Sequence, residues 1–299
     1  ARRDPDVERL RTIYRRLELN SLLRALDGGA DASRAGASSG GAVGTSGDLL
    51  GGGTGADRTP RASGGYAGPY GAAADDAFTP AGADPAIANA PRNYETVTTE
   101  AQLDAWLERL RTAPLFAFDT ETTCLEYMDA RIVGVSFAVA PGEAAYVPVA
   151  HVYAGAPDQL DRDAVLAKLK PLLEDDSRPK VCQHAKYDAH VLANHGIALA
   201  GLRYDSMLES YVLNSVATRH DMDSMAKKYL GVDTIKFEDV AGKGAKQLCF
   251  DQVPVDRAAE YAAEDADVTL RLHLTLWPQL EKQSRLRQLY EEVELPLVP

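Results

Sequence analysis

Acidic residues in three separate stretches of the chain could together support metal-assisted chemistry. Asp119 and Glu121 are two positions apart at the end of an apolar run, and in an extended strand both side chains lie on the same side. Tyr261 and Asp265 are four residues apart, so in a helix the phenol and the carboxylate share one face. Asp188 follows a short apolar run and falls in the first turn of an expected helix. Because Mg²⁺ and Mn²⁺ prefer oxygen ligands, these carboxylates are candidate metal ligands.

Each of these motifs also has an ordinary structural explanation. An Asp-x-Glu pair is often a solvated strand end, and residues 261–265 suit an amphipathic helix with an exposed acid. Asp188 in a first helical turn would by itself only stabilise the helix dipole. Taken singly, each motif favours the structural explanation, so the functional hypothesis depends on their joint occurrence.

The elements that must position these residues predict one α/β domain. A short strand at 94–97 is followed by Thr99 and Gln102, which have the spacing of a helix N-cap and its N3 partner. Strands first and interleaved helices later predict a mixed sheet covered by helices, in a domain of about 200 residues. Further strands are expected at 115–119, 132–139, 145–150 and 180–182, and helices at 161–173, 186–195, 205–214, 221–230 and 255–280.

The first 92 residues differ in composition from the rest. Residues 7–26 have apolar side chains at helical spacing, which predicts one amphipathic helix. Residues 27–92 are rich in Gly, Ala, Ser and Pro, and such a segment cannot bury enough surface to offset its ordering entropy. We therefore expect a disordered linker. The chain has no initiator Met and ends within an apolar pattern, so we expect it to be a piece of a longer polypeptide.

Composition and charge exclude several classes of protein. Of the 299 residues 45% are apolar, and the net charge is -12, which argues against a protein that coats duplex nucleic acid through a broad basic face. Cys124, Cys182 and Cys249 lack the paired spacing of a zinc or redox site. Apolar stretches are too short for a membrane span, and the N-terminus has no signal peptide.

Other catalytic motifs are missing from the sequence. The six histidines show neither HExxH nor paired Cys/His spacing, and no Gly-x-Ser-x-Gly elbow of an acyl hydrolase occurs. The glycine- and lysine-rich stretch at 242–246 lacks P-loop spacing. Its lysines could meet phosphates, but a mobile exposed loop is the better explanation of both.

The three acidic motifs occur in the order Asp-x-Glu, Tyr-Asp and Tyr-x-x-x-Asp, which resembles the exonuclease motifs of the DEDD superfamily in its tyrosine-bearing branch. Longer stretches are similar to the proofreading domains of the bacterial DNA polymerase I family (family A), and the resemblance covers residues 94–299. It implies an RNase H-like fold, 3′ to 5′ exonuclease activity in DNA replication and repair, and two divalent ions, Mg²⁺ or Mn²⁺, as cofactors. The stretches that carry it are 116–122, 205–214, 219–224 and 261–270.

The resemblance also implies domain boundaries. Residues 1–26 would be the C-terminal tail of a preceding 5′ nuclease region, and 27–92 the linker. Residues 93–290 would form the exonuclease domain, and 291–299 would begin a polymerase domain.

The same resemblance assigns a role to each acid. Asp119, Glu121 and Asp265 would hold the metal that activates water. Asp119 would bridge to a second metal, which Asp188 would hold through its waters. Tyr261 would orient the attacking water together with Glu121.

The resemblance further implies a set of substrate-binding residues. Aromatic and aliphatic members would stack on unpaired bases at the 3′ end, although each could equally be a core residue. His184 stands where the family usually has Asn, so binding of the substrate end differs there, whereas the four acids are intact. The implied residues are Leu125, Gln183, His184, Tyr187, Arg219 and Phe237.

As partners we expect single-stranded or frayed DNA 3′ ends and a polymerase domain in the full-length chain. We expect no membrane association, and a monomer in the bacterial cytoplasm near the nucleoid. Two other functions stay open: an RNA-processing 3′ to 5′ exonuclease of the same superfamily, and a non-catalytic spacer that holds DNA. The polymerase-like flanking sequence counts against the first, and the intact acids count against the second.

Overall fold

The computed structural model describes residues 7–8, 11 and 81–298. The chain divides into two units, Ala1–Gly68 and Pro69–Pro299. In the first unit the described residues are helical, and Arg11 Nη1 forms an ion pair with Glu8 Oε1 at 2.6 Å. The rest of the helix expected at 7–26, and the linker expected from residue 27 as far as residue 80, lie outside the described residues.

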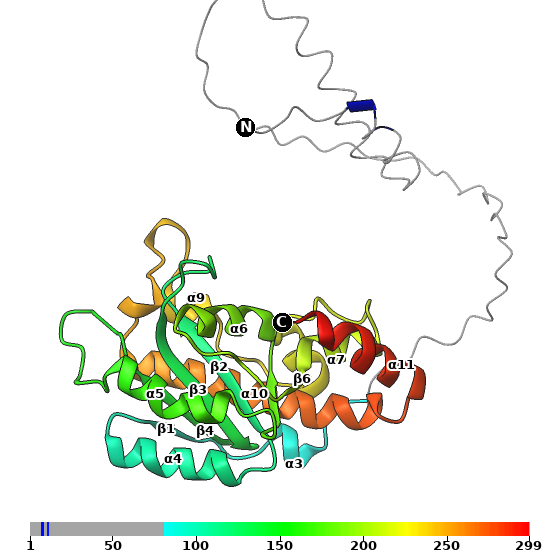
Figure 1. Ribbon diagram of the computed structural model, residues 1–299, viewed down its shortest axis with the longest axis horizontal. Helices are drawn as coiled ribbons and strands as arrows, with labels where there is room; N and C mark the ends of the chain where they lie inside the picture. The colour runs from blue at the N-terminus through cyan, green and yellow to red at the C-terminus, as the bar shows by residue number, and fades with distance from the viewer. Residues whose placement is uncertain (1–6, 9–10, 12–80, 299) are drawn as a thin grey trace, which may run out of the picture. The chain divides into compact units, whose positions relative to one another are not determined.

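A six-stranded sheet with the order β1-β4-β3-β2-β5-β6 forms the centre of the second unit (Figure 1). β3 runs antiparallel to its neighbours β2 and β4, whereas the pairs β1–β4, β2–β5 and β5–β6 are parallel. The predicted mixed sheet is therefore confirmed. The strands are β1 Asn93–Thr96, β2 Phe116–Thr122, β3 Ile132–Ala140, β4 Glu143–Pro148, β5 Lys180–Cys182 and β6 Leu202–Asp205.

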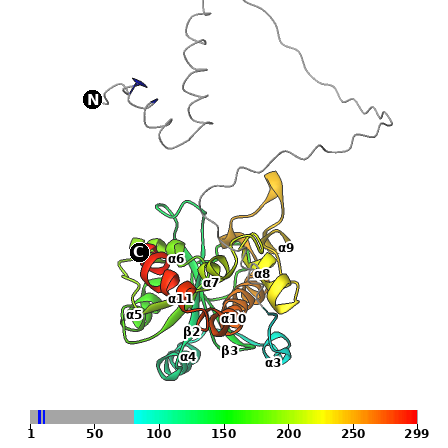
Figure 2. The ribbon, with the colours of Figure 1, turned by 90° about the vertical axis from the view of Figure 1, so that its right-hand side faces the viewer.

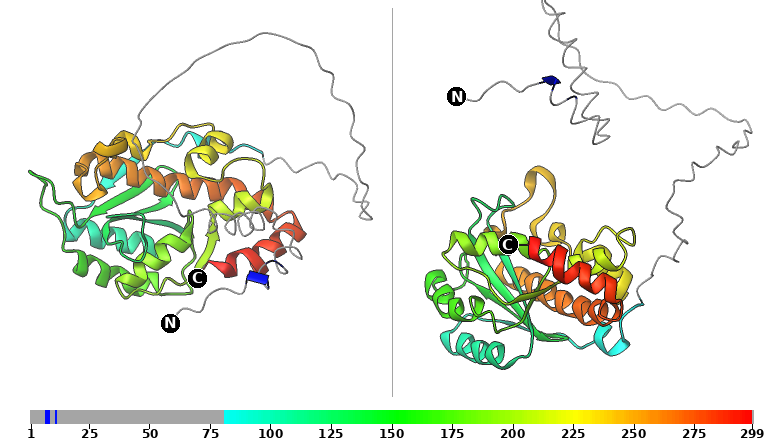
Figure 3. Two further views of the ribbon diagram at one scale, coloured as in Figure 1. Left: turned by 90° about the horizontal axis from the view of Figure 1, so that it is seen from above. Right: turned by 45° about the vertical axis from the view of Figure 1, so that its right-hand side comes forward.

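Helices cover both faces of this sheet. The long helix α10 lies across one face, and α4, α5 and α6 lie on the other (Figure 3). The helix α7 packs against α10 and α11 (Figure 2). The α-helices are α3 Pro85–Ala88, α4 Glu100–Thr112, α5 Arg162–Leu173, α6 Ala185–Asn194, α7 Ser206–Leu213, α8 Met222–Met225, α9 Phe237–Ala241, α10 Val255–Leu280 and α11 Ser284–Leu289. The π-helices are η1 Ala226–Leu230 and η4 Tyr290–Glu294, and the 3-10 helices are η2 Gly244–Lys246, η3 Phe250–Gln252 and η5 Leu295–Leu297.

Side-chain alternation along β2 decides which residues face α10. Phe116 and Phe118 are buried in the core formed with α4 and α5, whereas Ala117 packs against Ala263 and Ala266 of α10. Small side chains at this contact let the helix lie close to the sheet. Odd-numbered residues further along β2 therefore point to the α10 face.

The segment that enters the sheet is ordered over residues 81–92, which corrects the prediction of a linker as far as residue 92. Ala83 N–H donates to the Tyr229 carbonyl at 2.7 Å. The buried Arg271 guanidinium donates to the carbonyls of Ala88 and Ala90 at 3.2 and 3.3 Å. Composition failed here because these contacts use backbone groups, which any residue type provides. Within the described residues, no helix is long and apolar enough to cross a membrane.

Candidate active site

The sheet and α10 bring three of the candidate acids together. Asp119 and Glu121 lie on the side of β2 that faces α10, opposite Ser136 and Gly134 of β3. The strand continues to Thr122, so the acids lie within it rather than at its end as expected. From the helix, Asp265 faces them, and its Coulomb repulsion contributes to the raised pKa of both strand acids.

Asp188 approaches from the opposite side of the strand. It lies in the first turn of α6 and is 2% exposed. Thr120, between the two strand acids, donates to Asp188 Oδ1 from its N–H at 3.1 Å and from its hydroxyl at 2.5 Å. Acids therefore lie on both sides of β2: Asp119 and Glu121 on one side, and Asp188 of α6 on the other. Thr120 lies between the two strand acids in sequence and is hydrogen-bonded to Asp188.

The site carries unbalanced negative charge. Burial, followed by repulsion from Asp265, raises the pKa of Asp119 from 3.8 to about 8. Burial and then the neighbouring acids also raise the pKa of Glu121 and Asp188. Burial likewise raises the pKa of Asp265, although the nearby Tyr261 hydroxyl lowers it in part. Within residues 81–298 no salt bridge links any of the four acids to Lys, Arg or His.

The donor set fits a hard divalent cation. Carboxylate oxygens are the ligands that Mg²⁺ and Mn²⁺ prefer, and a cation would remove the repulsion that raises these pKa values. In the described part of the chain, no three His, Cys, Asp or Glu side chains are already arranged to hold a metal ion. Binding would therefore require the carboxylates to adjust around the cation.

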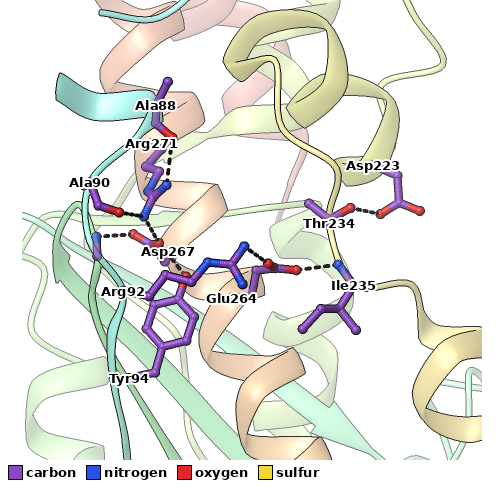
Figure 4. Close-up of polar contacts among 11 residues, drawn as sticks. Ala88, Ala90, Arg92, Tyr94, Asp223, Thr234, Ile235, Glu264, Asp267 and Arg271 are labelled. Atoms are coloured by element: carbon purple, nitrogen blue, oxygen red, sulfur yellow. Dashed lines mark hydrogen bonds and ion pairs between the residues drawn. The ribbon is translucent and has the colours of Figure 1, made fainter. Parts of the chain in front are cut away.

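Ion pairs and hydrogen bonds on another side of α10 hold this helix against β1 (Figure 4). Asp267 is fully buried, pairs with Arg271 at 2.5 Å and accepts a hydrogen bond from the Tyr94 hydroxyl at 2.7 Å. Glu264 is also buried, pairs with Arg92 and accepts from Ile235 N–H at 2.5 Å. These contacts fix the helix that carries Asp265.

Asp205 orients the turn that precedes Asp188. Its buried carboxylate accepts from the N–H groups of His184 and Ala185 at 3.3 and 2.8 Å, and it also caps α7. His184 has φ 59°, a left-handed conformation that Asn adopts more readily than His. Its side chain is exposed and does not cap α6, so the departure from the usual Asn affects the surface and leaves the turn intact.

The other predicted substrate-binding residues differ in how firmly they are held. Tyr187 is bonded through its hydroxyl to the Thr122 hydroxyl at 2.5 Å and to the Cys124 carbonyl at 2.7 Å, which fixes the loop that begins after β2. On this loop Leu125 is 91% exposed. An aliphatic side chain so exposed is not a core residue, which settles that alternative.

Phe237, Gln183 and Arg219 have separate environments. The Phe237 ring is 39% exposed and packs edge-on to Tyr261, with ring centroids 6.2 Å apart. Gln183 uses its amide internally, donating to the His220 carbonyl at 3.1 Å and accepting from the Ser206 hydroxyl at 2.5 Å. Arg219 is paired with Asp221 at 3.1 Å. Among these three, only Phe237 contacts a predicted catalytic side chain.

Sequence reasoning missed three residues that shape the site. They are Thr120, Asp205 and Tyr146, whose ring lies against Gly134, the β3 partner of Glu121. Thr120 has the only sequence signal, its place between two acids on one strand. The importance of Asp205 and Tyr146 depends on which strands become neighbours, and a single sequence gives no direct signal of this.

Comparison with known proteins agrees with this geometry. A family model described as a 3′-5′ exonuclease, of the A-type DNA polymerases, matches residues 94–281. DNA polymerase I of Pseudomonas aeruginosa is 63% identical over 209 residues, covering 69% of this chain and 23% of the relative. DNA polymerase I of Rhizobium leguminosarum is 43% identical over 223 residues, covering 69% and 22%. The chain thus spans less than a quarter of the length of these curated relatives.

Solved structures share the fold at lower identity. Pol1 of M. smegmatis, in complex with DNA primer-template and dNTP, has a TM-score of 0.53 at 20% identity, covering 68% of this chain and 30% of that one. RNase D of Trypanosoma brucei, in complex with RNA U12, has a TM-score of 0.52 at 22% identity, covering 64% of each chain. These similarities confirm the expected RNase H-like α/β architecture.

Proposed function

The chain belongs to the family of 3′-5′ exonuclease domains of DNA polymerase I, and from this premise we propose that it hydrolyses single-stranded or frayed DNA from the 3′ end by two-metal catalysis. The products are nucleoside monophosphates. The observation that carries the metal dependence is the group of four buried acids, Asp119, Glu121, Asp188 and Asp265. The pKa of each is raised, in the first three partly by other members of the group, and none has a cationic partner among the described residues.

Phosphodiester hydrolysis needs an aligned nucleophile and neutralisation of the charge on the phosphate and the leaving oxygen. Two bound divalent ions supply that neutralisation and lower the pKa of water. Asp119, Glu121 and Asp265 would hold one ion, with Asp119 shared with a second ion near Asp188. This division of the ligands rests on the likeness of the motifs to the family.

Tyr261 is the residue placed to orient water. It lies four residues from Asp265 on the same face of α10, and its hydroxyl lowers the pKa of that carboxyl group. Its hydroxyl oxygen can accept a hydrogen bond from one O–H of the water, while the Glu121 carboxylate can accept a hydrogen bond from the other. In this proposal the two groups hold the attacking water in line, and the phenol stays protonated because burial raises its pKa well above the usual range.

The strand end would be held by side chains around the acids. Leu125 and Phe237 are exposed apolar groups suited to stacking on unpaired bases. Tyr187 supports the loop that carries Leu125. We propose that Arg219, whose side chain is 87% exposed, and His184 meet the phosphates or sugars of the strand. In the longer relatives this module is part of a DNA polymerase I, and we propose a polymerase domain as its partner in the full-length protein.

The test is digestion of a 5′-labelled single-stranded DNA oligonucleotide with Mg²⁺, with Mn²⁺, and with excess chelator. We expect shortening one nucleotide at a time from the 3′ end with either metal and none with chelator, and loss of activity in Asp119→Ala. Full activity in chelator or in that variant would overturn the two-metal assignment. A matched RNA oligonucleotide separates the DNA exonuclease from the RNA-processing alternative, and absence of any digestion would favour the spacer.

A further inference from the structure

A buried histidine connects β4 to the beginning of α10. His151 is 3% exposed, and its Nδ1 lies 2.9 Å from the carbonyl oxygen of Val253. Because a carbonyl only accepts, Nδ1 carries the proton, and in the neutral ring Nε2 accepts from the Tyr146 hydroxyl at 2.8 Å. The Gln159 side-chain amide bonds both backbone groups of His151: it accepts from the His151 N–H and donates to the His151 carbonyl, each at 2.8 Å.

Two further hydrogen bonds join the same two segments. Val152 N–H donates to the Asp251 carbonyl at 2.8 Å, and Val255 N–H donates to the Tyr153 hydroxyl at 3.1 Å. Val255 is the first residue of α10, and Tyr261 lies less than two turns further along this helix. The position of the helix start therefore sets the position of the Tyr261 ring.

Aromatic contacts connect the histidine to Tyr261 by a second route. The His151 ring lies 5.8 Å from Phe250, measured between centroids, and Phe250 lies 6.0 Å from Tyr261. Phe237 packs against both Phe250 and Tyr261 at 6.2 Å. Movement of His151 would thus shift the rings that support the Tyr261 phenol.

Tyr146, the hydrogen-bond partner of His151 on β4, lies beside the strand that carries Asp119 and Glu121. The Tyr146 hydroxyl lies against Gly134 of β3, the residue paired with Glu121, and the negative charges of Glu121 and Asp119 add to burial in raising the pKa of Tyr146. The Tyr146 ring lies over Gly134, where any side-chain carbon would overlap it. Since Gly134 is paired with Glu121 across β2 and β3, the ring is fixed against the strand that carries the acids.

We propose that His151 is a positioning residue for this site: by joining Tyr146 on β4 to the start of α10, it fixes the Tyr261 hydroxyl relative to Glu121. This rests on the proposed exonuclease function and adds a residue that the family likeness did not point to. His151 itself touches neither substrate nor reacting atoms, so its effect should pass through Tyr261.

A double-mutant cycle tests this coupling, with the single-turnover rate on a 5′-labelled single-stranded DNA oligonucleotide at saturating Mg²⁺ as the readout. Tyr261→Phe should slow cleavage by roughly 10²-fold, and His151→Ala by about 10-fold through misplacement, with the half-saturating DNA concentration nearly unchanged. If His151 acts through the phenol hydroxyl, the double variant should be about as slow as Tyr261→Phe alone. Independent effects would instead multiply to about 10³-fold.

Two further variants make the result specific. His151→Asn keeps an N–H donor toward Val253 and should recover most of the rate. It also replaces His151→Ala in the cycle if the alanine variant does not fold. His195 is the matched control, because its ring also bonds a backbone group, accepting from Ile132 N–H at 3.2 Å. His195→Ala should leave the rate within about 2-fold and multiply with Tyr261→Phe.

Multiplicative effects of His151 and Tyr261, or equal losses in His151→Ala and His195→Ala, would overturn the positioning role. Failure of the proposed function looks different, because cleavage would then persist in chelator or in Asp119→Ala. If both of these abolish cleavage while the cycle is multiplicative, only the positioning role is refuted.

Discussion

Replacing Asp119 with asparagine should stabilise the metal-free protein while abolishing its activity. The wild-type carboxylate is buried beside Asp265 and has no cationic partner among the described residues. An amide of the same shape removes one negative charge from this repulsion. Acids kept for catalysis at the expense of stability behave in this way when their metal is absent.

The magnitude follows from the shift in acidity. The pKa of Asp119 is raised from 3.8 to about 8 by burial and then by Asp265. An acid with a raised folded-state pKa contributes stability that is fully present below its unfolded pKa and is lost as the pH rises through the folded one. The window is therefore about pH 4 to pH 8. Within this window the wild type loses about 1.4 kcal/mol of unfolding free energy per pH unit. Between about pH 5 and about pH 8 the unfolding free energy of Asp119→Asn should therefore gain up to about 4 kcal/mol relative to wild type.

Thermal unfolding in chelator at a series of pH values measures this effect. A domain of about 200 residues changes its Tm by roughly 2 to 4 °C per kcal/mol, so the Tm advantage of Asp119→Asn should grow by roughly 8 to 16 °C between about pH 5 and about pH 8. Excess Mg²⁺ should raise the Tm of the wild type more than that of the variant. Asp158→Asn, at an exposed loop position, is the control and should follow the wild type. An advantage that is absent at high pH, or that does not vary with pH, would refute the reasoning.

Three other changes test separate parts of the structure. Asp265→Ala should reduce cleavage to background, whereas Tyr261→Phe should keep a measurable rate roughly 10²-fold below wild type; single-turnover kinetics that show equal rates would contradict their separate roles. Deleting residues 27–80 should leave the Tm nearly unchanged, because a segment of this composition buries too little apolar surface to add stability. Extending the deletion to 27–90 should lower the Tm measurably, because it removes the carbonyls that accept hydrogen bonds from the buried Arg271 guanidinium. Gly134→Ala should destabilise by about 1 to 3 kcal/mol or more in urea unfolding, since its new methyl would overlap a buried tyrosine ring; an unchanged midpoint would show that the ring can move.

Local patterns in the sequence predicted most elements correctly. Thr99 and Gln102 form the expected capping box at the start of α4, and the long helix was expected over the residues it occupies, Val255–Leu280. Prediction failed for some of the short elements: β6 Leu202–Asp205 and α9 Phe237–Ala241 were not anticipated, although the short strands β1 and β5 were. Four or five residues give too few positions for a period to be recognised.

The assembly of the site could be predicted only in part. Spacing showed that Asp119 and Glu121 share one side of a strand, as they do. It could not show that β2 lies between β3 and β5, an order that places the helix after β5, and hence Asp188, next to Thr120. Contacts between residues far apart in sequence depend on strand order, which a single sequence does not encode in any local pattern.

The acids of α10 show why the structure was needed to separate chemistry from packing. In the sequence, Glu264, Asp265 and Asp267 are nearly equivalent acids within one turn. In the fold, Glu264 is paired with Arg92 and Asp267 with Arg271, so their charges are balanced. A helix rotates about 100° per residue, and Asp265 therefore points to the sheet, where the neighbouring charges are also negative. An unpaired buried acid is costly in a folded protein. Glu264 and Asp267 each have an arginine partner, whereas Asp265 has no cationic partner within the described residues. This is the physical reason to expect that a metal ion supplies the positive charge beside Asp265.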